Sequence, residues 1–331
     1  MILVTGATGF FGINAVKELL SIGHSVVCAD LDGFPAATDA YFSEEEKARM
    51  VFERLDVRDR EAIANLFERC PVEQVIHAGA VTVLASEDEE KARLVMEVNA
   101  CGTFNLLEAS HNAAVKRFVY VSSSGVYGSR GAGVVPLHET TPYDPMGLYV
   151  AAKIYSELLC RRFDELGKFR VAVARIGSPY GPWERPTGTR HAMGLMHRLL
   201  TLAFEGQEAR IYGADSTRDW THMRDVARAT IDLALCPPDR LRHLLYNVTT
   251  GQNVSTGRIV ETLKRLVPEF SYRFVDCAEG ANVVAHLPNP RGPLDITRLM
   301  EDVDFVPAFD IEAGLADYAA WFTEYGRSAS E

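Results

Sequence analysis

The stretch TGATGFFG, residues 5 to 12, places three glycines directly after the apolar run MILV with which the chain begins. Apolar residues then recur at helical spacing from Ile13 to Leu20, which predicts a helix with one buried face. A strand, a glycine turn and a helix in this order suit a phosphate group, because glycine lets the backbone approach closely and the helix N-terminus offers unpaired N–H groups with partial positive charge. We therefore predict a dinucleotide pyrophosphate site built from Gly6, Gly9, Phe10, Phe11 and Gly12.

Short apolar runs alternate with helical patterns through the first half of the chain. Strands are expected at MILV, SVVCAD, QVIHAG, RFVYVS and RVAVARI, and helices at residues 12 to 22, 92 to 113 and 146 to 166. Strands that alternate with helices form right-handed crossovers, which build a parallel sheet covered on both faces. The predicted fold class is therefore α/β, a Rossmann-type doubly wound parallel sheet with a smaller C-terminal substrate-binding lobe.

The pattern changes beyond Ile176, where loops rich in glycine, proline and arginine are interrupted by helices expected near 191 to 205, 224 to 235 and 256 to 266. We predict a dinucleotide-binding domain over residues 1 to 176. Residues 177 to 325 are expected to form mainly the substrate lobe, with segments around 224 to 250 returning to the first domain. The tail GRSASE, residues 326 to 331, is predicted to be flexible.

The 331-residue chain carries a formal net charge of −11. Nucleic acids and anionic membranes are themselves negative, so non-specific binding to either is not expected. No uncharged apolar segment is long enough to span a bilayer, and no signal peptide precedes the first strand. Six dispersed cysteines, with no CxxC pair and no metal-ligand spacing, predict small buried side chains, a reducing cytoplasm and no metal site.

Asp30 ends the predicted second strand, where a carboxylate can accept hydrogen bonds from the ribose of an adenosine. The same charge would repel a 2′-phosphate, so NAD is favoured over NADP as the cofactor. Asp32 is the nearby alternative for this contact, and a loop-capping role for Asp30 stays open.

LYVAAK, residues 148 to 153, places Tyr149 and Lys153 one helical turn apart, so both side chains can reach a common pocket. Alone, the pair also fits a half-exposed aromatic residue beside a solvated charge. A phenol with an ordinary pKa near 10 is a poor base at neutral pH, but a neighbouring ammonium favours the phenolate. Tyr149 is therefore a candidate base and Lys153 a candidate for lowering the pKa of that base.

With the glycine turn, Asp30 and the Tyr149 to Lys153 pair in order, the sequence resembles the extended short-chain dehydrogenase/reductases, the NAD-dependent epimerase/dehydratase family. Later segments also resemble family signatures: RIGSPYGP at 175 to 182, RDWTHMRDVARA at 218 to 229 and YNVTTG at 246 to 251. The resemblance implies NAD as cofactor, a sugar substrate and a homodimer built on the helices that begin near Asn99 and Met146.

The resemblance also implies further site residues. In the family's pattern, Asp56 and Val57 contact the adenine, HAGA at 77 to 80 is a cofactor loop, and Asn99 opens the central helix. VSSSGVYG at 121 to 128 matches the strand that carries a catalytic hydroxyl, which polarises the carbonyl. Counting back four residues from Tyr127, as in the family's pattern, selects Ser123 for the catalytic hydroxyl. Ser122 and Ser124 are the alternatives if the match is shifted by one residue. The implied contacts to the cofactor are His77, Ala78, Gly79 and Asn99, with Tyr149 and Lys153 touching both cofactor and substrate.

Two acidic positions of the family are missing. Its dehydratases carry Asp-Glu directly after the hydroxyl residue and its decarboxylases carry Glu two positions after it, whereas this chain has Ser124 and Gly125. Elimination of water therefore lacks its acid and base. What remains is reversible oxidation: a nucleotide-sugar 4-epimerase that works through a transient keto intermediate or, alternatively, an NAD-dependent dehydrogenase of a free sugar, sugar acid or similar polyol. A non-enzymatic NAD-sensing role is a third hypothesis, which the intact catalytic set disfavours.

Arginine suits the recognition of a diphosphate, and Arg218 and Arg291 match family positions that hold phosphate. Ser124 and Ser178 are further candidates for substrate contact. Ser178 stands where the family usually has asparagine, and WERPTGTR at 183 to 190 is unlike the common pattern. Both departures favour the dehydrogenase alternative.

Overall fold

The central sheet has seven strands, all parallel, in the order β10-β6-β5-β4-β1-β2-β3. This is a computed structural model, and it describes the chain except for residues 84, 114, 131–134, 191–192, 287–290 and 327–331. The strands are β1 (Ile2–Thr5), β2 (Val26–Asp30), β3 (Met50–Arg54), β4 (Gln74–His77), β5 (Arg117–Ser123), β6 (Arg170–Ile176) and β10 (Leu245–Val248). The predicted doubly wound α/β fold is confirmed.

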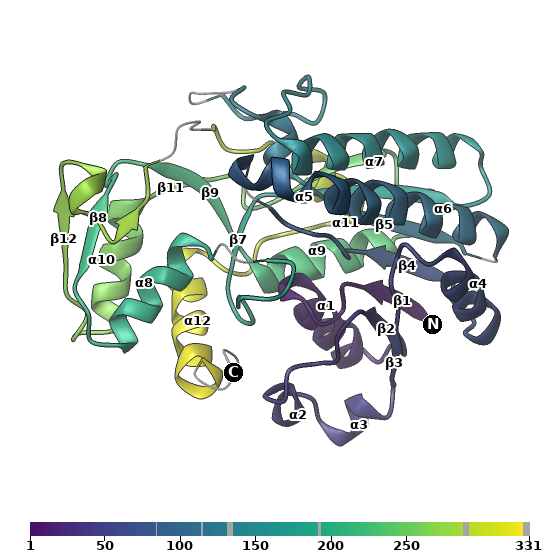
Figure 1. Cartoon of the computed structure of the whole chain (residues 1–331), viewed down its shortest axis with the longest axis horizontal. Helices are drawn as coiled ribbons and strands as arrows, with labels where there is room; N and C mark the ends of the chain where they lie inside the picture. The colour runs from purple at the N-terminus through teal and green to yellow at the C-terminus, as the bar shows by residue number, and fades with distance from the viewer. Residues whose placement is uncertain (84, 114, 131–134, 191–192, 287–290, 327–331) are drawn as a thin grey trace.

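Helices cover both faces of this sheet (Figure 1). One face packs against α1 (Phe10–Ser21) and α9 (Met223–Leu235), and the other against α4 (Arg60–Arg69), α6 (Gly102–Asn112) and α7 (Leu148–Glu165). Most strand residues are therefore buried on both sides, which explains why the runs are continuously apolar instead of alternating. The strand order reverses between β1 and β4, and such a reversal opens a crevice at the carboxyl ends of the strands.

The single helix predicted over 92 to 113 is wrong in detail. The segment divides into α5 (Asp88–Val95), a π-helical stretch from Met96 to Cys101, and α6. Each turn of a π-helix takes in one extra residue, which re-aims the side chains without ending the helix. Here the π stretch contains Asn99, whose side chain bonds to both backbone groups of Val81.

The second lobe lies at the left of Figure 1 and contains two three-stranded sheets. One sheet consists of β7 (Ser178–Tyr180), β9 (Thr217–His222) and β11 (Asn253–Ser255), and the other of β8 (Ala209–Tyr212), β12 (Tyr272–Val275) and β13 (Val283–Val284). Its helices include α8 (Leu195–Phe204), α10 (Thr256–Leu266) and α12 (Ile311–Tyr325). Within residues 224 to 250, β10 joins the large sheet and α9 packs on α1, while the predicted domain boundaries stay a prediction.

Helices α4 and α12 were not among the predicted elements. Helix α12 is held by aromatic contacts with the 183 to 190 segment: the ring centroids of Trp183 and Trp321 lie 5.4 Å apart and those of Trp183 and Tyr325 lie 5.7 Å apart. Contacts between residues so distant in sequence cannot be read from a local pattern.

Three expectations concern the ends and the surface of the chain. The predicted flexible tail lies outside the described residues except for Gly326, which caps α12. The expectation of buried cysteines is wrong for Cys101 and Cys277, which are exposed. Within the described part of the chain, no helix combines the length and the apolarity that crossing a membrane requires.

Candidate active site

A cleft of about 470 Å³ opens at the carboxyl ends of β1 to β6. It contains most of the predicted cofactor residues together with the Tyr149 to Lys153 pair. The predicted residues that line it are Gly6, Gly9, Phe10, Phe11, Asp30, Asp56, Val57, Ala78, Gly79, Ser123, Tyr149 and Lys153.

The glycine turn packs closely against the loop after β4 and against α1. Gly6 has a φ of +68°, and a Cβ there would lie 2.8 Å from the backbone nitrogen of Gly79. Gly12 does not line the cleft; a Cβ at this position would lie 2.0 Å from the carbonyl oxygen of Gly6, so its role is to let α1 pack onto the turn. Helix α1 begins at Phe10 after Gly9 and carries no acidic residue in its first turn, so its free N–H groups fit a pyrophosphate.

Asp30 ties the second strand to this turn. Its Oδ2 accepts hydrogen bonds from the amide and the hydroxyl of Thr8, at 3.0 and 2.8 Å, and its Oδ1 accepts one from the amide of Leu31 at 2.8 Å. Asp30 and Leu31 line the cleft, whereas Asp32, the alternative, is exposed and does not. A carboxylate has about four lone-pair positions, so Asp30 keeps capacity to accept from a ribose.

Two residues implied by the resemblance lie behind the cleft, not in it. His77 is buried, with Nδ1 2.7 Å from the Thr5 hydroxyl and Nε2 3.0 Å from the Thr103 hydroxyl. Burial, assisted by the charge of Lys153, lowers its pKa to about 3. Asn99 is also buried and fixes the backbone of Val81. The structure therefore gives His77 and Asn99 supporting positions and no contact with the cleft.

The three serines at the end of β5 face different partners. Ser122 donates to the buried carboxylate of Glu157 at 2.6 Å. Ser123 lies where the cofactor cleft meets a second pocket, and its hydroxyl accepts from the amide of Gly125 at 3.0 Å. Ser124 accepts from the guanidinium of Arg291, and both residues line that second pocket. Only Ser123 therefore has its hydroxyl at the junction.

Tyr149 lines the cofactor cleft beside Ser123. Burial raises the pKa of its phenol, while the charge of Arg190 and the side chains of Thr82 and Ser123 act to lower it. The charge that lowers the pKa of Tyr149 thus belongs to Arg190, a residue that the sequence patterns did not single out.

Lys153 is 4% exposed and lies 5.8 Å from the centroid of the Tyr149 ring. Its ammonium donates to the carbonyl oxygen of Val121 at 2.8 Å. Burial lowers its pKa to about 8, and the negative charge of Glu157 opposes that fall.

Arg190 is held in place by contacts of the 183 to 190 segment. Its guanidinium pairs with the buried Glu184 at 2.6 Å and lies 5.1 Å from the centroid of the Phe10 ring. The backbone of Arg190 pairs with that of Thr82, next to a hydrogen bond from the Thr82 amide to the Thr189 carbonyl at 2.9 Å. The loop thus closes over the cleft, to which it contributes Arg185, Thr187, Thr189 and Arg190.

A second pocket of about 480 Å³ adjoins the first and contains the predicted substrate residues. The Arg218 guanidinium donates to the Ser178 hydroxyl at 3.4 Å. Burial and the charge of Arg291 lower the pKa of Arg218 to about 10. Neither arginine forms an ion pair with a carboxylate of the described chain, and no described lining residue is Asp or Glu. The lining includes Arg190, Arg198, Arg218 and Arg291, so the pocket fits an anion.

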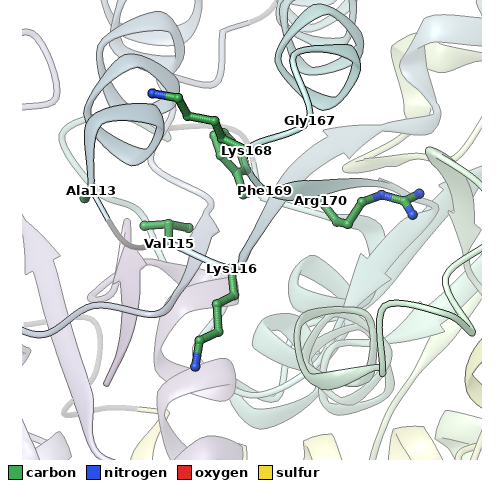
Figure 2. A pocket seen from close by; sticks show the side chains of 7 residues that line it. All are labelled: Ala113, Val115, Lys116, Gly167, Lys168, Phe169 and Arg170. Carbon is green, nitrogen blue, oxygen red and sulfur yellow. The ribbon is translucent and has the colours of Figure 1, made fainter.

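A separate hollow of about 510 Å³ lies at the amino ends of β5 and β6 (Figure 2). Its three cationic side chains point apart. Lys116 is paired with Glu73 at 2.8 Å, Lys168 donates to the His111 carbonyl and Arg170 is paired with Asp164 at 3.2 Å. They do not converge on one ligand. No group of three or more His, Cys, Asp and Glu side chains in the described chain could hold a metal ion.

Comparison with known proteins agrees with this geometry. Residues 2–248 match the model of the NAD dependent epimerase/dehydratase family. The chain is 29% identical to a UDP-glucuronate 4-epimerase of Thermodesulfobacterium geofontis, covering 97% of this chain and 96% of that protein, and 29% identical to a dTDP-glucose 4,6-dehydratase of Streptomyces griseus, covering 98% and 94%. It is also similar to the structure of a UDP-glucose 4-epimerase of Thermotoga maritima with UDP-glucose, with a TM-score of 0.77, 25% identity and 98% of each chain covered.

Proposed function

Because the chain belongs to the NAD dependent epimerase/dehydratase family, we propose that it is a 4-epimerase of a nucleotide-activated sugar, with a UDP-sugar as the first candidate. The predicted family and the NAD cofactor are confirmed by the family match. The observation that carries the choice of substrate is the pair of arginines, Arg218 and Arg291, in a pocket without acidic lining among the described residues. An anionic diphosphate supplies the charge that such a pair requires.

NAD would lie along the cleft from Asp30 to Tyr149. The α1 N-terminus would bind its pyrophosphate, Asp30 the adenosine ribose, and Lys153 the second ribose. A bound NAD would supply a reversible acceptor for the hydride of the sugar.

The protein's own groups manage protons and charge. Tyr149 would accept the proton of the sugar hydroxyl, and Arg190 with Lys153 would stabilise the resulting phenolate charge. Ser123 would donate to the oxygen of the keto sugar and stabilise the charge that develops there. Return of the hydride to the other face of the same carbon, together with return of the proton from Tyr149 to the sugar oxygen, would give the epimer.

Dehydration is disfavoured although some relatives carry that name. Elimination of water needs an acid and a base near the leaving hydroxyl. The two residues after Ser123 are Ser124 and Gly125, and the described lining of the substrate pocket offers no carboxylate in their place. The unusual 183 to 190 loop faces mainly the cofactor cleft, so it does not by itself favour a free-sugar substrate.

The assembly and the compartment are part of the proposal. Phe104 on α6 and Tyr155 and Leu158 on α7 are large apolar side chains that are exposed on two neighbouring helices, which supports a homodimer through these helices. The cytoplasm is the compartment that we propose. A monomeric mass at micromolar concentration would contradict the dimer.

The test of function is incubation of the protein and NAD with UDP-, GDP- and dTDP-sugars, free sugars and sugar acids. We expect an isomer of unchanged mass from one UDP-sugar, without net NADH. NADH accumulating in proportion to an oxidised product would establish the dehydrogenase instead.

A further inference from the structure

A buried ion pair lies directly behind the catalytic serine strand. Glu157 is on α7, one turn after Lys153, and is 1% exposed. Its Oε1 accepts from Ser122 at 2.6 Å and from Nε of Arg175 at 3.0 Å, and its Oε2 accepts from Nη2 of Arg175 at 2.6 Å. Arg175, on β6, is also 1% exposed. Two arginine nitrogens on the two carboxylate oxygens fix that carboxylate in one orientation.

Helix α7 thus holds two consecutive residues of β5. Lys153 binds the carbonyl of Val121 and Glu157 binds the hydroxyl of Ser122. Ser123 is the next residue, and its hydroxyl must stay at the junction of the two cavities to reach a substrate. The contacts from α7 leave the strand end little freedom to twist, which is the kind of support that a precise active-site geometry needs.

The Glu157 carboxylate also has an electrostatic effect on Lys153. Glu157 opposes the effect of burial on the Lys153 ammonium more than any other group does. The groups near Lys153 are Cys160 and Tyr149 on α7, Tyr120 on β5 and His77 on β4. The groups near Glu157 are Arg175 and Tyr143, and the Tyr143 hydroxyl donates to Oε2 at 3.0 Å. Apart from Arg175, these neighbours are uncharged at neutral pH.

We propose that Glu157 is a positioning residue that aligns the Ser123 strand end through Ser122 and places a negative charge one helical turn from the Lys153 ammonium. The inference rests on the proposed roles of Ser123 and Lys153. It assigns the Glu157 to Arg175 pair a role in the geometry of the site. A buried ion pair does not by itself guarantee a gain in stability.

Two substitutions separate the two tasks. Glu157→Gln keeps the shape of the side chain and removes its charge, whereas Ser122→Ala keeps the charge and removes the contact with β5. Tyr143→Phe is the matched control, because it removes a hydrogen bond to the same carboxylate without touching either the charge or the strand. If Glu157→Gln folds poorly because Arg175 is left unpaired, the double variant Glu157→Gln/Arg175→Met removes both charges together.

The first readout is the pH dependence of NAD binding, measured by titration calorimetry. In the parent protein, affinity is expected to fall as pH rises through about 8, where Lys153 loses its proton. Removal of the Glu157 charge is expected to lower the pH at which the affinity for NAD begins to fall. For each pH unit of this shift, the affinity for NAD above that pH falls roughly ten-fold. Ser122→Ala and Tyr143→Phe leave the limb in place. An unmoved limb in both Glu157 variants would overturn the charge role.

The second readout is turnover with the substrate found in the panel assay. Ser122→Ala is expected to lower kcat roughly ten-fold or more with little change in NAD affinity, because only the alignment of Ser123 is affected. Wild-type kcat in this variant would overturn the alignment role. The binding readout needs no sugar, so a failure to find a nucleotide-sugar substrate leaves it intact as a test of Glu157.

Discussion

The amide and the hydroxyl of Thr8 both donate to Oδ2 of Asp30, at 3.0 and 2.8 Å, so the glycine turn and the second strand are joined through one carboxylate. The carboxylate therefore faces the cleft with a fixed orientation, at the place where an adenosine ribose would lie. We expect this arrangement to favour NAD over NADP, because a 2′-phosphate would meet the negative charge.

Asp30→Asn is expected to weaken NAD roughly ten-fold and to reduce the discrimination against NADP, since the amide lacks the charge and one acceptor. Titration calorimetry with both cofactors measures the change. Asp32→Asn is the control, because exposed Asp32 does not line the cleft. Equal effects of the two substitutions would contradict the assignment of Asp30.

Arg190→Gln is expected to shift the acid limb of the pH profile of kcat to higher pH. The charge of Arg190 lowers the pKa of Tyr149 against the effect of burial, so its removal leaves the phenol harder to ionise. Arg190→Lys should restore part of the shift. Arg162→Gln is the control, since Arg162 is exposed on α7, lines neither pocket and is not among the groups that act on Tyr149. If the acid limb of the kcat profile is unchanged in Arg190→Gln, Arg190 does not act on the pKa of Tyr149, and its role is restricted to ligand binding.

Arg218→Met is expected to raise KM for the nucleotide sugar by roughly ten- to a hundred-fold, which corresponds to the loss of a charge-assisted hydrogen bond. The NAD affinity should not change, because Arg218 lies in the second pocket and outside the cofactor cleft. Steady-state kinetics together with calorimetry separate the two effects. Arg258→Met, on the exposed surface of α10, provides the comparison. A free-sugar substrate with unchanged KM would remove the phosphate role.

The buried His77 is expected to reduce the free energy of unfolding in acid. Burial lowers its pKa from the ordinary 6.5 to about 3, so the unfolded chain binds a proton over this interval and the folded chain does not. The contribution of His77 is complete above pH 6.5 and is lost as pH falls towards 3. His77→Gln should flatten the fall of the free energy of unfolding in this window, measured by denaturant titration at a series of pH values. His24→Gln should keep the slope, and a slope unaltered in His77→Gln would contradict the account.

The sequence predicted those parts of the site that depend on neighbours along the chain. The glycines of residues 5 to 12 and the Tyr149 to Lys153 spacing are local, and all but Gly12 line the cleft. The directions of two side chains were harder to predict. His77, at the end of β4, points into the interior, and Asn99 is turned towards Val81 by a π-helical stretch. Neither direction follows from a match of motifs.

Long-range contacts explain what was missed. Arg190 reaches Tyr149 only because the 183 to 190 loop pairs with Thr82, and Glu157 meets Arg175 only because β6 lies beside β5 under α7. The predicted parallel sheet allows such long-range contacts, but it does not determine which side chains form them. The aromatic packing of α12 on Trp183 belongs to the same class.

The most direct test of the epimerase proposal uses a UDP-sugar deuterated at C4, incubated with the protein and catalytic NAD, with the products analysed by mass spectrometry and NMR. A 4-epimerase returns the same hydride, so we predict a C4 epimer that keeps its deuterium, and no such product from Tyr149→Phe. Loss of the deuterium into the cofactor pool, with an oxidised sugar as the product, would contradict the account.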